Sequence, residues 1–445
     1  MKLKTTTYLC AASLLVAVVV RLALLVTYRP LYSNDSPSYA ALAHMIQAGS
    51  FADYDGRRTP GYPLFMWLLH FNNQWIRFAQ YLCGLLSILL IYVLARQAVP
   101  RSQAWVLLMF MGISIQFPFY ESMIQTEAPA MLVMLGSLYF FVAPASRPRC
   151  NLAMAGVLAA SGALIRPHLV ILPPIYLAIY ALQNRRNVRQ RLGGLLVLAL
   201  PAVLLVGGWI LFNYNMLSRA TFTTLPRADI IAHMIHYLPD ADEKFGQVKD
   251  AYIEAYAAMK DKVEASDDNR CWYTTYAGQL LRQRGFAINL ALGDTIHDMA
   301  MDLIKKHPFG YLKNVIYAWL RFWRVHIIVY EECFAPNAGL YRAVMWLWLP
   351  IKGLWLVVNG LFLAFLPIWP FLSMSSRRRF LLVTLYGLVL AASLSQALTQ
   401  YFDNARFAVP FQPLVAIAVA MVGATLFERF GKSGAGGALH DQNPQ

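Results

Sequence analysis

Residues 33–39 read SNDSPSY and contain the first residue whose type and position suggest chemistry, Asp35. They follow an apolar run over residues 5–28 in which Arg21 is the one charged residue. Ionisable groups near hydrocarbon are costly, and where they occur they mark functional sites by default. Asp35 is therefore a candidate catalytic carboxylate at the point where the chain leaves a membrane, and its role depends on which charges share its side.

Further charges lie at the ends of other apolar runs, far from Asp35 in the sequence: Asp53, Asp55, Glu121, Glu127, Asp403, Arg57, Arg58, Arg166 and Arg406. Each has an ordinary explanation when taken singly. Asp35 can simply cap a helix, and Arg58 can extend its side chain to lipid headgroups. As a set they are harder to explain in this way, so we expect the helices to bring them together around one cavity at the outer face of the membrane.

This combination of charges suits a lipid-linked phosphate. Guanidinium groups bind phosphate oxygens in pairs, so arginines at the membrane rim fit a phosphate held at headgroup level. A carboxylate beside them fits a general base that takes the proton of an attacking hydroxyl. A phosphate leaving group needs positive charge around it rather than a general acid. The residues therefore predict sugar transfer from a polyisoprenyl-phosphate carrier.

Composition indicates an all-α polytopic membrane protein. The chain is 58% hydrophobic and 14% charged, and runs of about twenty apolar residues recur, the length that crosses a bilayer. A net charge of +15 is also typical of proteins that bind nucleic acid. Fifteen of the basic residues, however, lie in short breaks between the apolar runs, which is the distribution of cytoplasmic loops. We expect no nucleic-acid partner.

Ten spans follow from this pattern, near residues 7–28, 76–95, 102–120, 125–144, 151–165, 168–183, 193–213, 352–372, 380–398 and 408–427, with both termini in the cytoplasm. We expect 311–330 to form an amphipathic helix on the outer surface. If it and 338–350 both cross, the count is twelve. We expect two helices in the first outer loop. The first is capped by Asp35 or Ser36 and ends before Gly49, and the second runs from Pro60 through Leu69.

We expect four regions along the chain. They are an N-terminal transmembrane catalytic module (1–213, with its first outer loop at 29–75), an extracytoplasmic helical domain (214–340), C-terminal transmembrane helices (341–431) and a disordered cytoplasmic tail (432–445).

The stretch from "SNDSPSYAALAHMIQAGSF" to "RRTPGYPLFMWLL" resembles the first extracytoplasmic loop of the GT-C-fold glycosyltransferases. The similarity is to the branch with protein O-mannosyltransferases and the lipid A aminoarabinose transferase. Further segments match in the family's order: "QTEAPAMLVMLGSLYFF", "GALIRPHLVILPP", "IKKHPFGYLKNVIYAWLRFW" and "NARFAVPFQPLVAIAVA". The resemblance implies a GT-C-like bundle of about 10 (10–12) transmembrane helices, with interfacial helices in the first outer loop.

By this resemblance, Asp35 matches the family's catalytic acidic residue, implied to act as base on the acceptor. Glu127 matches the second acidic position, which orients acceptor or donor. Arg58 is implied to contact the lipid phosphate, while Arg166 and Arg406 have phosphate or structural roles. Three residues complete the expected substrate-binding set: Arg57, Tyr62 and Tyr401.

We therefore expect an inverting glycosyltransferase of a bacterial inner membrane. It would move a monosaccharide from a polyprenyl-phosphate donor to a glycan, lipid or protein acceptor on the extracytoplasmic side. Asp35 is followed by Ser36 rather than a second acidic residue, which argues against the protein-mannosyltransferase subtype. The alternatives are a polymerase or ligase of lipid-linked glycans, and a secondary transporter or flippase. Transporters concentrate charge at the membrane midplane and often contain two related halves, which this sequence does not suggest.

No cofactor is expected. Some relatives on this fold hold a divalent cation beside their carboxylates, which would here place it on Asp35 and Glu127. His233 and His236 are spaced like metal ligands but have no evident acidic or cysteine partner nearby. Whether Cys271 and Cys333 form a disulfide in an oxidising compartment is left open by the sequence.

Overall fold

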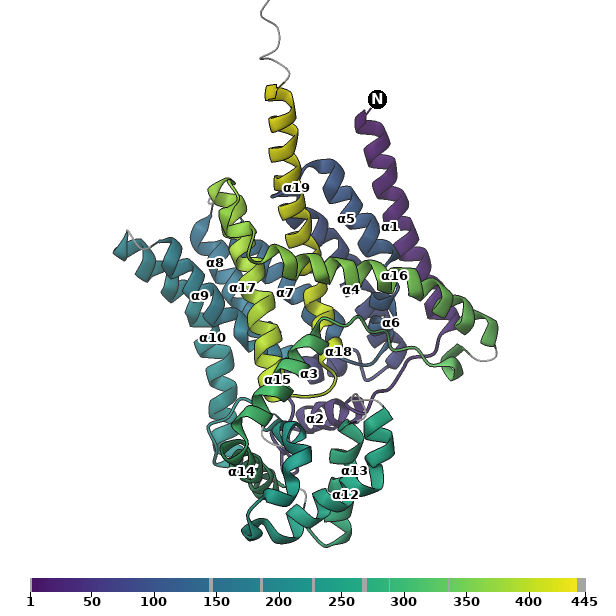
Figure 1. Cartoon of the computed structure of the whole chain (residues 1–445), viewed down its shortest axis with the longest axis vertical. Helices are drawn as coiled ribbons and strands as arrows, with labels where there is room; N and C mark the ends of the chain where they lie inside the picture. The colour runs from purple at the N-terminus through teal and green to yellow at the C-terminus, as the bar shows by residue number, and fades with distance from the viewer. Residues whose placement is uncertain are drawn as a thin grey trace, which may run out of the picture.

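The computed structural model describes residues 2–143, 147–184, 187–225, 229–265, 270–287, 289–334 and 337–437. Across these ranges the regular structure is helical, and the one extended element is an isolated bridge between Leu31 and Met123. The start of α1 (Lys2–Thr27) and the end of α19 (Gln412–Gly437) lie on the same side of the molecule (Figure 1). The expected all-α polytopic fold is confirmed.

The apolar helices of the described residues correspond to the ten expected spans. Six are long and apolar enough to cross a membrane, and the bent pair Arg101–Ile113 and Gln116–Ser122 passes the same test as one span. Three shorter apolar helices, Ala11–Thr27, Glu127–Val142 and Pro167–Gln183, account for the others. The bundle helices are α4 (Asn73–Arg96), α5 (Arg101–Ile113), α6 (Gln116–Ser122), α7 (Glu127–Val142), α8 (Pro148–Ile165), η1 (Pro167–Ile171), α9 (Leu172–Gln183), α10 (Val188–Leu217), α16 (Ala338–Phe365), α17 (Ser376–Thr399), α18 (Asn404–Ala408) and η7 (Val409–Phe411).

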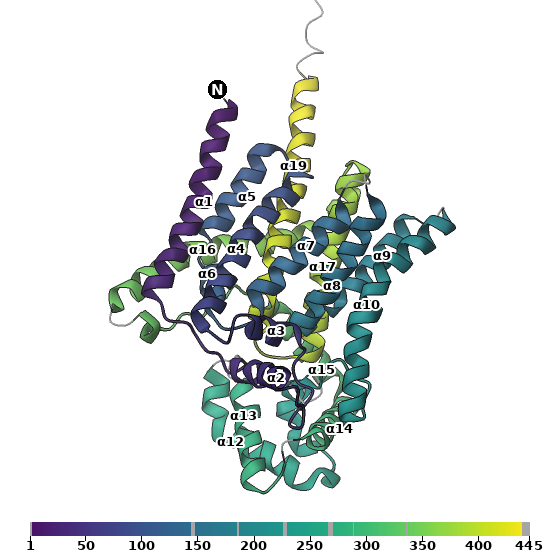
Figure 2. The ribbon, with the colours of Figure 1, turned by 180° about the vertical axis from the view of Figure 1, so that it is seen from behind.

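One expected span has different limits. The prediction of 352–372 is wrong at both ends, because α16 runs without a break from Ala338 to Phe365. Proline usually interrupts helices, and Pro350 lies inside α16. Within membranes, proline is tolerated inside a helix. The twelve-span alternative therefore fails, and Figures 1 and 2 show α16 crossing the bundle obliquely.

The two helices of the first outer loop form where the sequence predicts them. The first, α2, spans Ser36–Ala48 and ends at Gly49, whose φ of 64° is the left-handed conformation that glycine favours. The second, α3, spans Gly61–Leu68. A Cβ on Gly61 would lie 2.7 Å from the carbonyl oxygen of Leu164, so glycine lets α3 rest directly on the end of α8.

A group of helices, here called the helical cap, covers α2 on the side opposite the chain ends (Figures 1 and 2). It has its own apolar core, which includes Met234, Leu281 and Met299. Its elements are η2 (Ile230–Asp240), η3 (Glu243–Phe245), α12 (Gly246–Ala265), α13 (Arg270–Gln283) and α14 (Leu290–Lys306).

The helix that follows the cap, α15 (Pro308–Phe322), is amphipathic as expected. Val315 and Ala318 are buried on one face, whereas Leu312 and Ile316 are exposed on the other. Two short turns complete the chain, η5 (Glu331–Phe334) and η6 (Trp369–Phe371). Because α19 extends to Gly437, the first residues of the expected disordered tail are helical, and residues 438–445 lie outside the described residues.

Candidate active site

The SNDSPSY segment is fixed against the segment that precedes α7. The amide of Ile124 donates to the carbonyl of Leu31 over 2.9 Å, and the Leu31 amide donates to Ser122. The Ser36 hydroxyl donates to the carbonyl oxygen of Ile124 over 2.9 Å. The contact between Ser36 and Ile124 joins residues that are 88 positions apart in the sequence. Together these contacts set the position of Asp35 at the start of α2.

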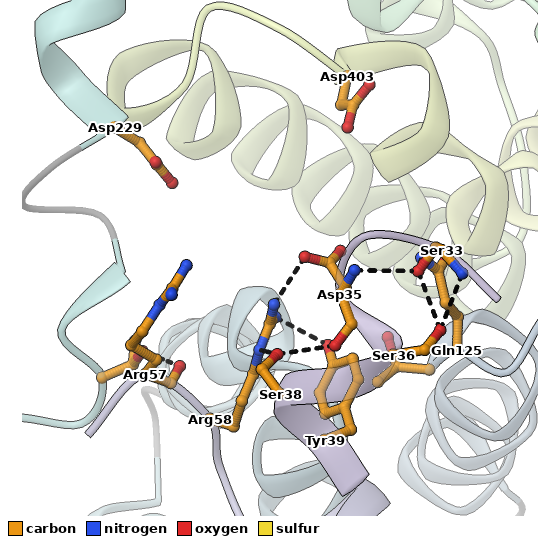
Figure 3. A network of polar contacts seen from close by, with 12 residues as sticks. Ser33, Asp35, Ser36, Ser38, Tyr39, Arg57, Arg58, Gln125, Asp229 and Asp403 are labelled. Atoms are coloured by element: carbon orange, nitrogen blue, oxygen red, sulfur yellow. Dashed lines mark hydrogen bonds and ion pairs between the residues drawn. The ribbon is translucent and has the colours of Figure 1, made fainter. Parts of the chain in front are cut away.

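Asp35 occupies the cap position of α2, but its side chain does not cap the helix. Instead, its Oδ1 lies 2.6 Å from Nη2 of Arg58 (Figure 3), and its Oδ2 lies 2.7 Å from Nη2 of Arg406. Burial alone would raise the pKa of Asp35, but the charges of Arg406 and Arg58 hold that pKa well below its usual range. The carboxylate is therefore ionised, and both of its oxygens are paired.

Two neighbours of Asp35 also hold Arg58. Its Nε donates to the Ser38 hydroxyl over 2.7 Å, and its Nη1 donates to the Tyr39 hydroxyl over 3.1 Å. The guanidinium also lies 4.3 Å from the centre of the Tyr39 ring, a cation–π distance. Ser38 and Tyr39, the last polar residues of SNDSPSY, thus orient Arg58 toward Asp35.

Glu127 joins the other two arginines. Its Oε1 lies 3.0 Å from Nη1 of Arg166 and 3.1 Å from Nε of Arg406. Its side chain is 2% exposed and does not line the cavity described below. In this geometry Glu127 contacts the guanidinium groups of Arg166 and Arg406, and its predicted catalytic role in orienting acceptor or donor would act through them.

The position that a shared metal ion would take is filled by protein. The guanidinium of Arg406 lies between Asp35 and Glu127, in contact with both. Among the described residues, no three histidine, cysteine or acidic side chains are grouped as metal ligands would be. The arrangement does not fit a cation held by these two carboxylates.

Arg166 has hydrogen-bonding capacity that the protein leaves unused. Its Nη1 donates to the Thr126 hydroxyl over 2.8 Å, and its guanidinium lies 4.7 Å from the centre of the Phe407 ring. Nε and Nη2 are buried without a hydrogen-bond partner, and the side chain is 4% exposed. Buried donors of this kind are costly unless something satisfies them.

These groups open into one large cavity of about 1440 Å³. Asp35, Arg58, Arg166 and Arg406 line its membrane side. The opposite side is formed by the segment after α10 and by the helical cap, through residues of α12, α13 and α14. The structure therefore brings together the main charges that the sequence singled out, from the first loop to the last span.

Other expected residues lie differently. Arg57 lines the cavity and extends away from Asp35 toward Asp229 (Figure 3). Tyr62 is fully buried, where its hydroxyl donates to Gln80 over 2.8 Å, and Tyr401 is buried against the guanidinium of Arg321. Neither tyrosine lines the cavity, because both aromatic rings fill the packing beneath it.

Four further charges were expected to join this group, and Asp53 and Asp55 both line the cavity. Asp403 lines the cavity and lies 3.5 Å from Nη1 of Arg406. Glu121 is instead paired with Arg21 at 2.6 Å inside the bundle, away from the cavity. Cys333 is a free, buried thiol, so it does not form the disulfide that the sequence left open.

Sequence reasoning missed Asp229, which lines the same cavity from the start of η2. Its Oδ2 accepts a hydrogen bond from Nε2 of Gln400 over 2.7 Å. Burial and, to a smaller extent, the charge of Asp35 raise the pKa of Asp229 to about 6. No motif marks this residue in the sequence, and it belongs to a region whose acidic and basic residues are nearly balanced.

Residues 62–209 match the family model described as dolichyl-phosphate-mannose-protein mannosyltransferase. No curated protein sequence matches the chain. Among solved structures, the apo oligosaccharyltransferase of Archaeoglobus fulgidus is 14% identical with a TM-score of 0.49, and the comparison covers 99% of this chain and 52% of that one. ArnT from Cupriavidus metallidurans bound to undecaprenyl phosphate is 15% identical with a TM-score of 0.37, covering 93% of this chain and 77% of that one.

This chain spans about half the length of the archaeal oligosaccharyltransferase. The family match begins within the first outer loop and runs to α10, across Glu127 and Arg166. The predicted resemblance to membrane glycosyltransferases of the mannosyltransferase branch is thus confirmed by the family model over residues 62–209.

Proposed function

We propose that this protein is an inverting glycosyltransferase that moves one sugar from a polyprenyl-phosphate donor to an acceptor on the extracytoplasmic face. The observation that carries the proposal is Arg166. Two of its guanidinium nitrogens are buried and unpartnered at the membrane side of the cavity, next to a carboxylate that is paired with two further arginines.

A lipid phosphate is the ligand that this arrangement favours. Phosphate oxygens accept charge-assisted hydrogen bonds from guanidinium groups, which would satisfy the two free nitrogens of Arg166. The phosphate would also compete with Asp35 for Arg58 and Arg406. The donor named for the matched family, dolichyl-phosphate mannose, is itself a lipid-phosphate sugar.

Donor binding would also activate the base. In the resting site the arginines make Asp35 a weak base, because its negative charge is already compensated. A phosphate that takes over these guanidinium groups removes that compensation. The pKa of Asp35 then rises, and its oxygens become free to accept a proton. Asp35 would thus become basic when a donor is present.

The transfer is a single displacement. The acceptor hydroxyl gives its proton to Asp35 while its oxygen forms a bond to the anomeric carbon. The bond from that carbon to the phosphate oxygen breaks, and the polyprenyl phosphate leaves with the electron pair. Arg58, Arg166 and Arg406 stabilise the additional negative charge on this leaving group. Attack from the opposite face inverts the anomeric configuration.

A transfer assay tests the proposal. Full-length protein in lipid nanodiscs is incubated with undecaprenyl phosphate carrying a labelled hexose, pentose or aminosugar, together with glycolipid, polysaccharide or protein fractions as acceptors. We expect labelled product with at least one donor, and at least about 100-fold less product with Asp35→Asn. Wild-type turnover in Asp35→Asn would overturn the role of the carboxylate, and failure to use any of the lipid-phosphate donors would overturn the proposed donor class.

A further inference from the structure

The side of the cavity that faces the donor site differs in chemistry from the membrane side. Here the lining comes from the helical cap and carries amide, hydroxyl and charged groups, among them Thr274, Thr275, Gln279, Arg282, Asn289 and Asp294. Both sides enclose the same space of about 1440 Å³. The cavity can therefore hold a second, polar substrate against the cap while a lipid phosphate occupies the membrane side.

Asp229 lies on the cap side of the cavity, and its carboxylate faces the space that Asp35 also lines. In Figure 3 the carboxylate of Asp229 points into the space that it shares with Arg57 and Asp35. Asp35 has both oxygens in ion pairs, whereas Asp229 has only Oδ2 engaged, by Gln400. In the part of the chain that the structure describes, no hydrogen bond or ion pair reaches Oδ1 of Asp229.

The orientation of Asp229 is fixed in advance by the end of α17. Nε2 of Gln396 donates to Oε1 of Gln400 over 2.7 Å, and Nε2 of Gln400 in turn donates to Asp229. All three residues line the cavity, and Gln396 is 3% exposed. A side chain held in this way loses little conformational freedom when it binds a ligand, so its free oxygen is available without rearrangement.

We propose that Asp229 binds the acceptor, and that this acceptor is a carbohydrate that donates a hydroxyl hydrogen bond to Oδ1. This inference rests on the proposed function and adds the acceptor class to it. A carboxylate accepts hydrogen bonds only, so its partner must be a donor, and sugar hydroxyls both donate and accept. The hydroxyl and amide side chains on the same wall suit a ligand of that kind.

Arg57 and Arg58 place positive charge near Asp229. Arg57 and Arg58 both lie close enough to oppose the rise in the pKa of Asp229. Their positive charge would repel an amine entering the site but would not affect a neutral sugar. Asp229 therefore favours hydroxyl donors, and it holds the acceptor on the cap side of the cavity while a second acceptor hydroxyl reaches Asp35.

Binding of printed oligosaccharides tests this inference. Full-length protein in nanodiscs is applied to a saccharide array, and the affinity for the strongest binder is then measured in solution. We expect affinity to fall at least about tenfold in Asp229→Asn and Asp229→Ala. It should be unchanged in Asp250→Asn, a matched loss of charge on an exposed residue of α12. Affinity for undecaprenyl phosphate should stay within about twofold in all three variants.

The outcomes separate the two proposals. Wild-type saccharide affinity in both Asp229 variants would overturn the role of Asp229. Retention of peptides on a parallel peptide array, with no saccharide retained, would overturn the carbohydrate class. In either case, binding of undecaprenyl phosphate by the variants would still support the proposed donor site. If the wild-type protein did not bind undecaprenyl phosphate, that result would contradict the proposed function itself.

Discussion

Asp35 and Arg406 are 371 residues apart in the sequence, and their side chains form an ion pair of 2.7 Å. Arg58 takes the other oxygen of the same carboxylate at 2.6 Å. The first outer loop and the start of the last span are therefore joined at one residue. This pairing compensates the negative charge of Asp35 at rest, so a phosphate must replace Asp35 as the partner of these arginines before Asp35 can act as a base.

Replacing Asp35 by asparagine should separate chemistry from donor binding. We expect sugar transfer to fall by at least about 100-fold, the lower range for loss of a general base. Undecaprenyl phosphate should bind as tightly as in the wild type or more tightly, because Arg58 and Arg406 lose their competing carboxylate. Transfer of labelled sugar and lipid affinity measured on the same preparation check both parts. Weaker lipid binding in this variant would contradict the competition.

Arg166 should contribute to lipid affinity through its free nitrogens. A hydrogen bond to a charged group contributes about 1.5–3 kcal/mol, so Arg166→Gln should weaken binding of undecaprenyl phosphate roughly tenfold to a hundredfold. Arg166→Lys keeps the charge without the paired geometry and should recover part of that loss. Arg284→Gln, in the helical cap and away from the cavity, is the control. Equal affinity for Arg166→Gln and the control would exclude Arg166 from the phosphate site.

Gly84 should prove necessary for the buried pair of Arg21 and Glu121. A Cβ at position 84 would lie 1.9 Å from Oε1 of Glu121, so Gly84→Ala must displace that carboxylate from Arg21. Breaking a buried ion pair typically costs about 3–5 kcal/mol. We expect a clear drop in the thermal midpoint, measured by size-exclusion chromatography after heating. Gly208→Ala in α10 meets no atom within 4 Å and should leave the midpoint unchanged or higher.

Acceptor binding should depend on pH through Asp229. The pKa of this carboxyl is raised to about 6, so it is ionised above that pH and becomes protonated below it. Saccharide affinity should therefore fall as the pH is lowered through about 6, because a protonated carboxyl is a poorer acceptor. The other charged or titratable groups that face it are Asp35, Arg57, Arg58 and Tyr252.

None of these neighbours should reproduce that transition. The pKa of Asp35 lies well below this range, arginines stay protonated, and burial raises the pKa of Tyr252 further above neutral. A titration of saccharide affinity from pH 5 to pH 8 checks the prediction. The transition should be absent in Asp229→Asn, and its survival there would assign it to another group.

The sequence predicts helices well here because apolar length and end signals are local properties. Pro37 and Gly49 set the limits of α2, and the ten apolar runs coincide with apolar helices, of which six, or seven with the bent pair, are long enough to cross a membrane. It also predicts that Asp35, Arg58 and Arg406 share a cavity, because all three end or flank spans on the same side. The charges of these residues and the predicted topology are enough to place them on one side of the membrane, even when the packing of the helices is unknown.

The sequence could not assign what depends on packing alone. Tyr62 and Tyr401 flank the site in sequence, yet both face the core, because a side chain's direction follows from the rotation of its element. Glu127 belongs to the same group of charges but lies behind the arginines. Asp229 lines the cavity because the helical cap folds back over α2 (Figure 2), and no local sequence pattern predicts that contact.

The position of a bound lipid phosphate tests the central claim most directly. A structure of the full-length protein in nanodiscs with undecaprenyl phosphate should show phosphate oxygens within hydrogen-bond distance of Nε and Nη2 of Arg166. The Asp35–Arg406 pair, 2.7 Å apart without the lipid, should then be broken. A phosphate bound elsewhere, with Asp35 still paired to both Arg58 and Arg406, would contradict the account.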